Sequence, residues 1–67
     1  MQKDFSFIGS GSVVLVVPLT RKADRFTKAR IYTEPWQWMG SGFACEPRMA
    51  QEILEGVRDA GLTVEVL

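Results

Sequence analysis

Residues 47–67 read PRMAQEILEGVRDAGLTVEVL, and this stretch decides the fold class. Its first part carries apolar residues at steps of three and four, which is the period of a helix that buries one side. These residues are Met49, Ala50, Ile53, Leu54, Val57 and Ala60. Pro47 suits the first helical position, where a missing N–H costs nothing, and Gly61 is a natural stop signal. The pattern predicts a helix over residues 47–60.

The residues after Gly61 alternate in the way that a strand does. In LTVEVL, residues 62–67, the apolar side chains of Leu62, Val64 and Val66 share one face. We therefore expect the helix to be followed directly by a strand.

Gly56 lies inside the predicted helix, where a glycine costs about 1 kcal/mol relative to alanine. It falls on the margin of the apolar stripe. We interpret it as a point where the helix closely approaches a neighbouring strand, because protein interiors are tightly filled. A contact with a partner helix is the alternative interpretation.

The stretch VVLVVP, residues 13–18, is β-branched and apolar on both faces, which predicts a central strand that is covered on both sides. Pro18 ends this strand, and Thr20 offers a helix cap. The following segment, up to residue 33, fits either a helix with a basic stripe or an alternating strand. We favour the helix, because a central strand needs a cover and Thr20 is a good start signal.

Two short stretches of the chain resemble each other. FSFIGSG at residues 5–11 and WQWMGSG at residues 36–42 share an aromatic pair, an aliphatic residue and Gly-Ser-Gly. They could be two similar strand–turn units, in which the glycines make a turn or a bulge. Alternatively, residues 1–12 form a loose extension, as chain termini often do.

These patterns together predict an α+β fold in one small domain. The expected order is β-α-β-α-β, with a short, three- or four-stranded, mostly antiparallel sheet and helices packed on it. The domain is expected over residues 13–67, and residues 1–12 are expected to be an N-terminal extension or an edge strand. The elements are strand 13–18, helix 20–32, strand material within 36–45, helix 47–60 and strand 62–67.

The charges of the chain sum to zero but are unevenly distributed. Residues 1–33 hold six basic and two acidic side chains, and residues 34–67 hold two basic and six acidic ones, so the halves carry +4 and −4. Five basic residues fall within 21–30. Such a local field can steer a partner, although the simpler interpretation is that the basic segment and the acidic helix compensate each other within the fold.

The sequence argues against an enzyme. It contains no histidine, which excludes a Ser-His-Asp triad, and Gly-Ser-Gly at residues 40–42 matches neither a nucleophile elbow nor a phosphate-binding loop. Its only cysteine, Cys45, is expected to be a small buried side chain. No group of residues has metal-ligand spacing. We therefore expect no catalytic residue, no cofactor and no metal site.

The sequence also bears on location. A single cysteine suits a reducing compartment, so we expect a cytoplasmic protein. The longest apolar run, residues 13–19, is too short to span a bilayer, and its flanks do not fit a signal peptide. No membrane association is expected.

Trp36 and Trp38 are the first candidates for a binding surface. Their spacing in a strand would put both on one face, with Gln37 and Met39 on the other. An exposed tryptophan pair would anchor a partner, since tryptophan is enriched at binding hot spots. A buried pair would only add bulk to a small core, and we expect one to be largely buried and the other partly exposed.

The basic segment is the second candidate. Its residues Arg21, Arg25, Lys28 and Arg30 form a stripe that could grip a protein partner or, in a salt-sensitive way, a phosphate backbone. Nucleic-acid-binding modules normally carry an excess of positive charge, and this chain carries none.

Residues 15–66 resemble a class of small uncharacterised α/β proteins of phage and mobile-element genomes. The resemblance rests on PLT opening a helix, on WMGSGFACEPRMAQEILEGVRDAGL, and on the closing strand. Its motifs are structural, namely turn glycines, a cap and a helix stripe. These motifs carry no activity across. Phage accessory proteins of this size commonly bind and block a host protein, so an accessory protein of that kind is expected by association alone.

The function expected from the sequence is a small, non-enzymatic protein-binding module. It would use Trp36 and Trp38 or the basic stripe, and would act as a monomer or a weak homodimer. The alternative is a small nucleic-acid-associated protein that uses residues 21–30.

Overall fold

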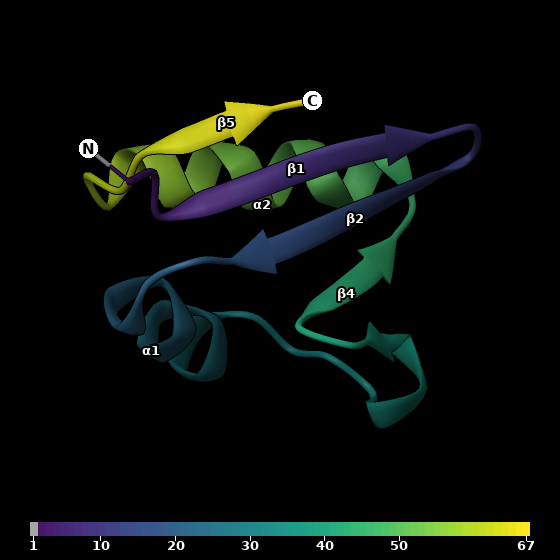
Figure 1. Ribbon diagram of the computed structural model, residues 1–67, viewed down its shortest axis with the longest axis horizontal. Helices are drawn as coiled ribbons and strands as arrows, with labels where there is room; N and C mark the ends of the chain where they lie inside the picture. The colour runs from purple at the N-terminus through teal and green to yellow at the C-terminus, as the bar shows by residue number, and fades with distance from the viewer. Residues whose placement is uncertain (1) are drawn as a thin grey trace.

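The structure is a computed structural model that describes residues 2–67 (Figure 1). In this part of the chain the elements, in order, are β1 (Phe5–Ser10), β2 (Val13–Pro18), α1 (Arg21–Arg30), the 3-10 turn η1 (Pro35–Gln37), β3 (Trp38–Met39), β4 (Gly42–Cys45), α2 (Pro47–Asp59) and β5 (Val64–Val66).

The strands form one mixed sheet in the order β3-β4-β2-β1-β5. β1 pairs with β5 in parallel, and every other pairing in the described sheet is antiparallel. The α+β fold class is confirmed. The sheet has five strands, however, rather than the expected three or four.

The additional strand comes from the N-terminal residues. β1 lies between β2 and β5, so the expectation that residues 1–12 are an extension or an edge strand is wrong for the residues that the structure describes. The reason is burial: Phe5 and Phe7 are 0% and 4% exposed and belong to the core. Without β1, the last strand would have no partner, because β5 pairs with β1 alone.

The two Gly-Ser-Gly stretches each contribute a hairpin turn. Gly11 joins β1 to β2 and has φ 63°, and Gly40 joins β3 to β4 and has φ 71°. A serine follows each of them without a positive φ, which is the pattern of a type II′ turn. The two stretches are not equivalent in structure, however. In the first, the turn glycine is the last residue of the motif, Gly11, whereas in the second it is the first glycine, Gly40, and Gly42 lies in β4.

Both helices pack on the same face of the sheet. Figure 1 shows α2 running behind β1, and α1 follows the end of β2. One core contains side chains from the sheet and from both helices. Its buried members are Phe5, Phe7, Val16, Ala23, Phe43, Cys45, Ala50, Ile53, Val57 and Leu62.

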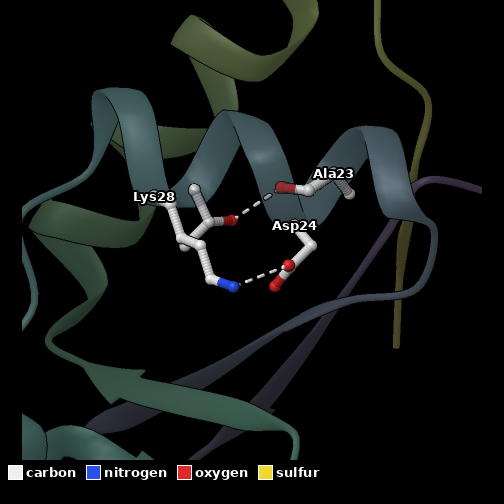
Figure 2. Close-up of polar contacts among 4 residues, drawn as sticks. Ala23, Asp24 and Lys28 are labelled. Atoms are coloured by element: carbon white, nitrogen blue, oxygen red, sulfur yellow. Dashed lines mark hydrogen bonds and ion pairs between the residues drawn. The ribbon is translucent and has the colours of Figure 1, made fainter.

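The two helices follow their sequence signals. In α2 the predicted apolar stripe buries Ala50, Ile53 and Val57. The segment after Thr20 is a helix, and Thr20 caps it as expected: its hydroxyl accepts a hydrogen bond from the Ala23 backbone N–H at 3.1 Å. The buried Thr27 hydroxyl donates to the Ala23 carbonyl at 2.9 Å (Figure 2).

Asp4 ties together three segments that are distant in sequence. Its carboxylate accepts hydrogen bonds from the Thr20 hydroxyl at 2.8 Å, and from the Thr63 backbone N–H at 3.0 Å and hydroxyl at 3.2 Å. The bond from the Thr63 N–H, followed by that from Thr20, lowers the pKa of Asp4 below its usual 3.8. This carboxylate thus joins the start of β1, the cap of α1 and the residue before β5.

Candidate functional site

The two tryptophans do not share a face, which corrects the expectation from their spacing. Trp36 lies in η1, where its side chain is 78% exposed. Trp38 is partly buried: its indole N–H donates to the Thr33 hydroxyl at 2.9 Å, and its ring centroid lies 5.2 Å from that of Phe43. Trp38 therefore supports the core, and Trp36 alone is free to contact a partner.

Gln37 produces this difference. It is 9% exposed, its side-chain oxygen accepts from the Glu34 backbone N–H at 2.7 Å, and its side-chain nitrogen donates to the Ala44 carbonyl at 3.1 Å. These bonds hold the 3-10 turn against β4 and leave Trp36 outside. The turn starts at Pro35, and Glu34 and Gln37 form a capping box, a signal in the sequence that could have indicated it.

The sheet has a second apolar face, and in the described part of the chain no helix packs on it. We call it the open sheet face, and its apolar residues are Ile8, Val13, Leu15, Val17, Met39 and Ala44. The polar residues Ser6 and Glu65 lie on the same side, toward the β5 edge. Ile8 and Ala44 flank Leu15 on the neighbouring strands. Val13 and Met39 are 42% and 63% exposed. The expectation that strand 13–18 is covered on both sides is thus wrong.

Gly42 shapes the middle of the open sheet face. A Cβ atom on Gly42 would lie 2.8 Å from Val17 Cγ2 and 3.3 Å from Leu15 Cγ. The absence of a side chain lets Leu15 and Val17 lie over β4. The water-facing side of an antiparallel sheet normally carries polar side chains, so this apolar surface is unusual. Its signal was present in the sequence, because VVLVVP is apolar on both faces.

Trp36 borders a hollow that reaches the edge of this face. The hollow has a volume of about 360 Å³ and is lined by Val13, Trp36, Ala44 and Met49, among others. Val13 and Ala44 belong to the open sheet face. The exposed tryptophan and the apolar sheet surface are therefore neighbours, although the sequence separates them.

The basic segment is exposed along α1, where Arg21, Lys22, Arg25, Lys28 and Arg30 are all on the surface. Among residues 2–67 the one ion pair joins Lys28 to Asp24 at 3.1 Å (Figure 2). The guanidinium of Arg30 lies over the ring of Phe26, 5.8 Å from its centroid.

A cleft of about 390 Å³ separates α1 from α2. From α1 and its C-terminal end it is lined by Phe26, Arg30, Ile31 and Tyr32, and from α2 by Met49, Glu52, Ile53 and Gly56. The expectation that Gly56 meets a neighbouring strand is wrong, because a Cβ atom built there meets nothing within 4 Å. No local pattern in the sequence indicated this cleft.

Cys45 is 7% exposed, which confirms the expectation of a small buried side chain. Burial, and then the charge of Glu46, raises the pKa of its thiol, so the thiolate is disfavoured. Within residues 2–67, no three histidine, cysteine or acidic side chains come together to hold a metal ion.

No known protein family, curated protein or solved structure matches this chain. The relation to small proteins of phage and mobile-element genomes therefore stays a prediction. No helix in the described residues is long and apolar enough to cross a membrane.

Proposed function

We propose that this chain is a non-enzymatic protein-binding module whose contact surface is the open sheet face together with Trp36. The observation that carries the proposal is the apolar side of β2, β1 and β4, which no helix in residues 2–67 covers. Contiguous exposed apolar surface on a small protein is typical of an interaction site. Trp36 adds an exposed aromatic side chain of the type that dominates binding energies.

The size of this surface favours a different protein over a second copy of the chain. A strand residue covers about 3.3 by 4.8 Å of sheet, so one whole side of this sheet, polar residues included, measures on the order of 300 Å². A stable complex buries about 800 Å² on each partner. A homodimer made by two such sheet faces would bury less than that area. A different protein that also surrounds Trp36 and its hollow would bury an area closer to it.

Two further observations bear on where the protein acts and on what kind of protein it is. The buried thiol of Cys45, the only cysteine in the chain, supports a reducing, cytoplasmic setting. The resemblance to small proteins of phage and mobile-element genomes supports an accessory protein that binds and blocks a host protein. That resemblance is an analogy between sequences and assigns no residue a role.

The test uses a double variant, Val13→Glu with Met39→Glu, which charges the open sheet face at its two most exposed positions. The matched control is Val66→Glu, another exposed valine, 65% exposed, on the side of the sheet that faces the helices. A protein captured by the wild type should be lost with the double variant and retained with the control. With that protein purified, the double variant should bind at least about tenfold more weakly.

Trp36 and Trp38 sharpen this test. Trp36→Ala should keep the wild-type melting temperature and weaken binding, because its side chain is exposed. Trp38→Ala should lower the melting temperature, because it removes the contacts with Thr33 and Phe43. Undiminished binding by both Trp36→Ala and the double variant would reject the proposal, and so would a stable homodimer in sedimentation experiments on the wild type.

The α1 cations support a second candidate, a nucleic-acid-associated protein. Arg21, Lys22, Arg25 and Arg30 are exposed, and in residues 2–67 none of them forms an ion pair. Binding of single- or double-stranded DNA or of RNA at low salt, with a steep loss as salt is added, would favour it. Undetectable binding at low salt would end it. The chain has no net positive charge, which is why we rank it second.

A further inference from the structure

The cleft between α1 and α2 contains a glycine whose presence the isolated chain does not explain. Gly56 lies in the interior of α2, where glycine costs about 1 kcal/mol relative to alanine. A Cβ atom there would meet nothing within 4 Å, so packing within this chain does not require glycine. A bare backbone at this point leaves space for a group that is not part of the chain.

Much of the lining of the cleft is apolar. The apolar side chains are those of Phe26, Ile31, Met49 and Ile53. All four are buried or partly buried and belong to the core or pack against it. The volume of about 390 Å³ lies within the range of pockets that bind ligands.

Arg30 is the one cation among the residues that line the cleft, and it comes from α1. A second hollow, of about 360 Å³, lies beside α1 and has Phe26 and Arg30 in common with the cleft. Lys22, Arg25 and Arg30 line it, together with Ala60 and Leu62, and it has no acidic side chain among its lining residues.

The charged residues of α1 that line the two hollows differ in their ion pairing from those that do not. Asp24 pairs with Lys28, neither of which lines the cleft or the second hollow. The cations that do line them, Lys22, Arg25 and Arg30, have no ion-pair partner within residues 2–67. Glu52 is the one acidic group at the cleft, and it lies on the α2 side. Carboxylates of a ligand would therefore lie along α1, and its apolar part over Gly56.

From this arrangement we propose that the cleft is a second binding site, which takes an acidic, amphipathic peptide segment of a protein partner. The segment inserts an apolar side chain between Phe26 and Gly56 and sets its carboxylates against Arg25 and Arg30. Arginine suits this role, because its planar guanidinium can hold a carboxylate through two hydrogen bonds. The inference rests on the proposed protein-binding function but uses a different surface from the open sheet face.

The experiment measures binding of a fluorescent synthetic peptide made of Glu-Glu-Phe-Leu repeats by anisotropy. Gly56→Leu fills the cleft, and Arg25→Glu with Arg30→Glu reverses the charge of the cation at the cleft and of one beside it in the second hollow. Each should weaken binding at least about tenfold. Gln51→Leu, at an exposed position of α2 that does not line the cleft, is the matched control and should bind as the wild type does. Circular dichroism checks that each variant is folded.

The charge and the apolar part of the peptide are tested separately. A peptide with lysine in place of glutamate should not bind, and one with serine in place of phenylalanine and leucine should bind at least about tenfold more weakly. Equal binding of the serine peptide, or unchanged binding by folded Gly56→Leu, would overturn the proposal. A DNA oligonucleotide that binds more tightly than the peptide, and is insensitive to Gly56→Leu, would assign the cations to nucleic acid instead.

The open-sheet-face variant distinguishes this inference from the proposed function. Val13→Glu with Met39→Glu should bind the acidic peptide as the wild type does, because neither residue lines the cleft. Loss of peptide binding in this folded variant would contradict a separate site. Failure of the peptide to bind the wild type would reject the cleft proposal and leave the capture test of the open sheet face unaffected.

Discussion

The two faces of the sheet are built from similar residues but have different surroundings. Along β2, Val14 and Val16 point to the helices and belong to or pack against the core, whereas Leu15 and Val17 point to the open sheet face. Both pairs are aliphatic. The two faces differ in what packs on them, because the two helices in residues 2–67 lie on one face only. Apolar character in a strand therefore indicates burial only where another layer is present to cover it.

The largest predicted effect comes from β1, because this strand has Phe5 on the face that the helices cover and Ile8 on the open sheet face. Phe5→Ala should lower the free energy of unfolding by about 3–5 kcal/mol, because it empties a fully buried site. It also removes edge-to-face contacts with Phe7 and Phe26 at 6.3 and 6.2 Å. Urea denaturation of the purified variant measures this loss.

The matched substitution on the open sheet face is Ile8→Ala, from the same strand. It should cost on the order of 1 kcal/mol, since the Ile8 side chain is only partly buried. Equal losses of unfolding free energy in Phe5→Ala and Ile8→Ala would mean that both faces of the sheet are equally covered. That result would contradict an open face.

A second comparison uses two glycines of the sheet. Gly42→Ala should cost about 1–3 kcal/mol through overpacking, because the new Cβ would lie 2.9 Å from the Val16 carbonyl oxygen, which belongs to the backbone and cannot easily move. Gly9→Ala is the control, since a Cβ there meets nothing within 4 Å. Thermal melting of both should show a large decrease for Gly42→Ala and little change for Gly9→Ala.

Gly56→Ala should stabilise the protein, in contrast to Gly42→Ala. It should raise the free energy of unfolding by about 1 kcal/mol, because alanine favours the helix and the space at this position is open. In a domain of this size that is a rise in melting temperature of roughly 4–8 °C. A decrease in melting temperature would show that the cleft is more tightly closed than the structure indicates.

The smallest predicted effect concerns Asp4 and appears in acid. Its pKa is lower in the folded chain than its usual 3.8, so its hydrogen bonds stabilise the fold above that pH, and this stability is lost as the pH falls through the folded pKa. Asp4→Asn should therefore be less stable than the wild type near neutral pH, and the difference should shrink in acid. Melting temperatures of both proteins across the acid range test this, and a constant difference would contradict it.

Local signals in the sequence predicted the second helix and its ends, and they favoured a helix after Thr20 while leaving a strand there as the alternative. The apolar stripe of residues 47–60, the cap at Thr20 and the prolines predicted both helices to within a few residues, because a helix satisfies its backbone hydrogen bonds between near neighbours. The candidate surface was predicted only in part. Trp36 was predicted from the sequence as a binding residue, and it is exposed. Its orientation away from Trp38 depends on Gln37, whose side chain donates a hydrogen bond to the Ala44 carbonyl.

The tertiary structure alone decided which strands pair and which surfaces stay open. Phe5 pairs with Val64 across 59 positions of sequence, and no local pattern encodes that contact. The open sheet face and the cleft beside Gly56 likewise depend on where α1 and α2 pack. The physical reason is that propensity and periodicity act over a few residues, whereas strand pairing and cover are settled by burial among segments that are distant in the chain.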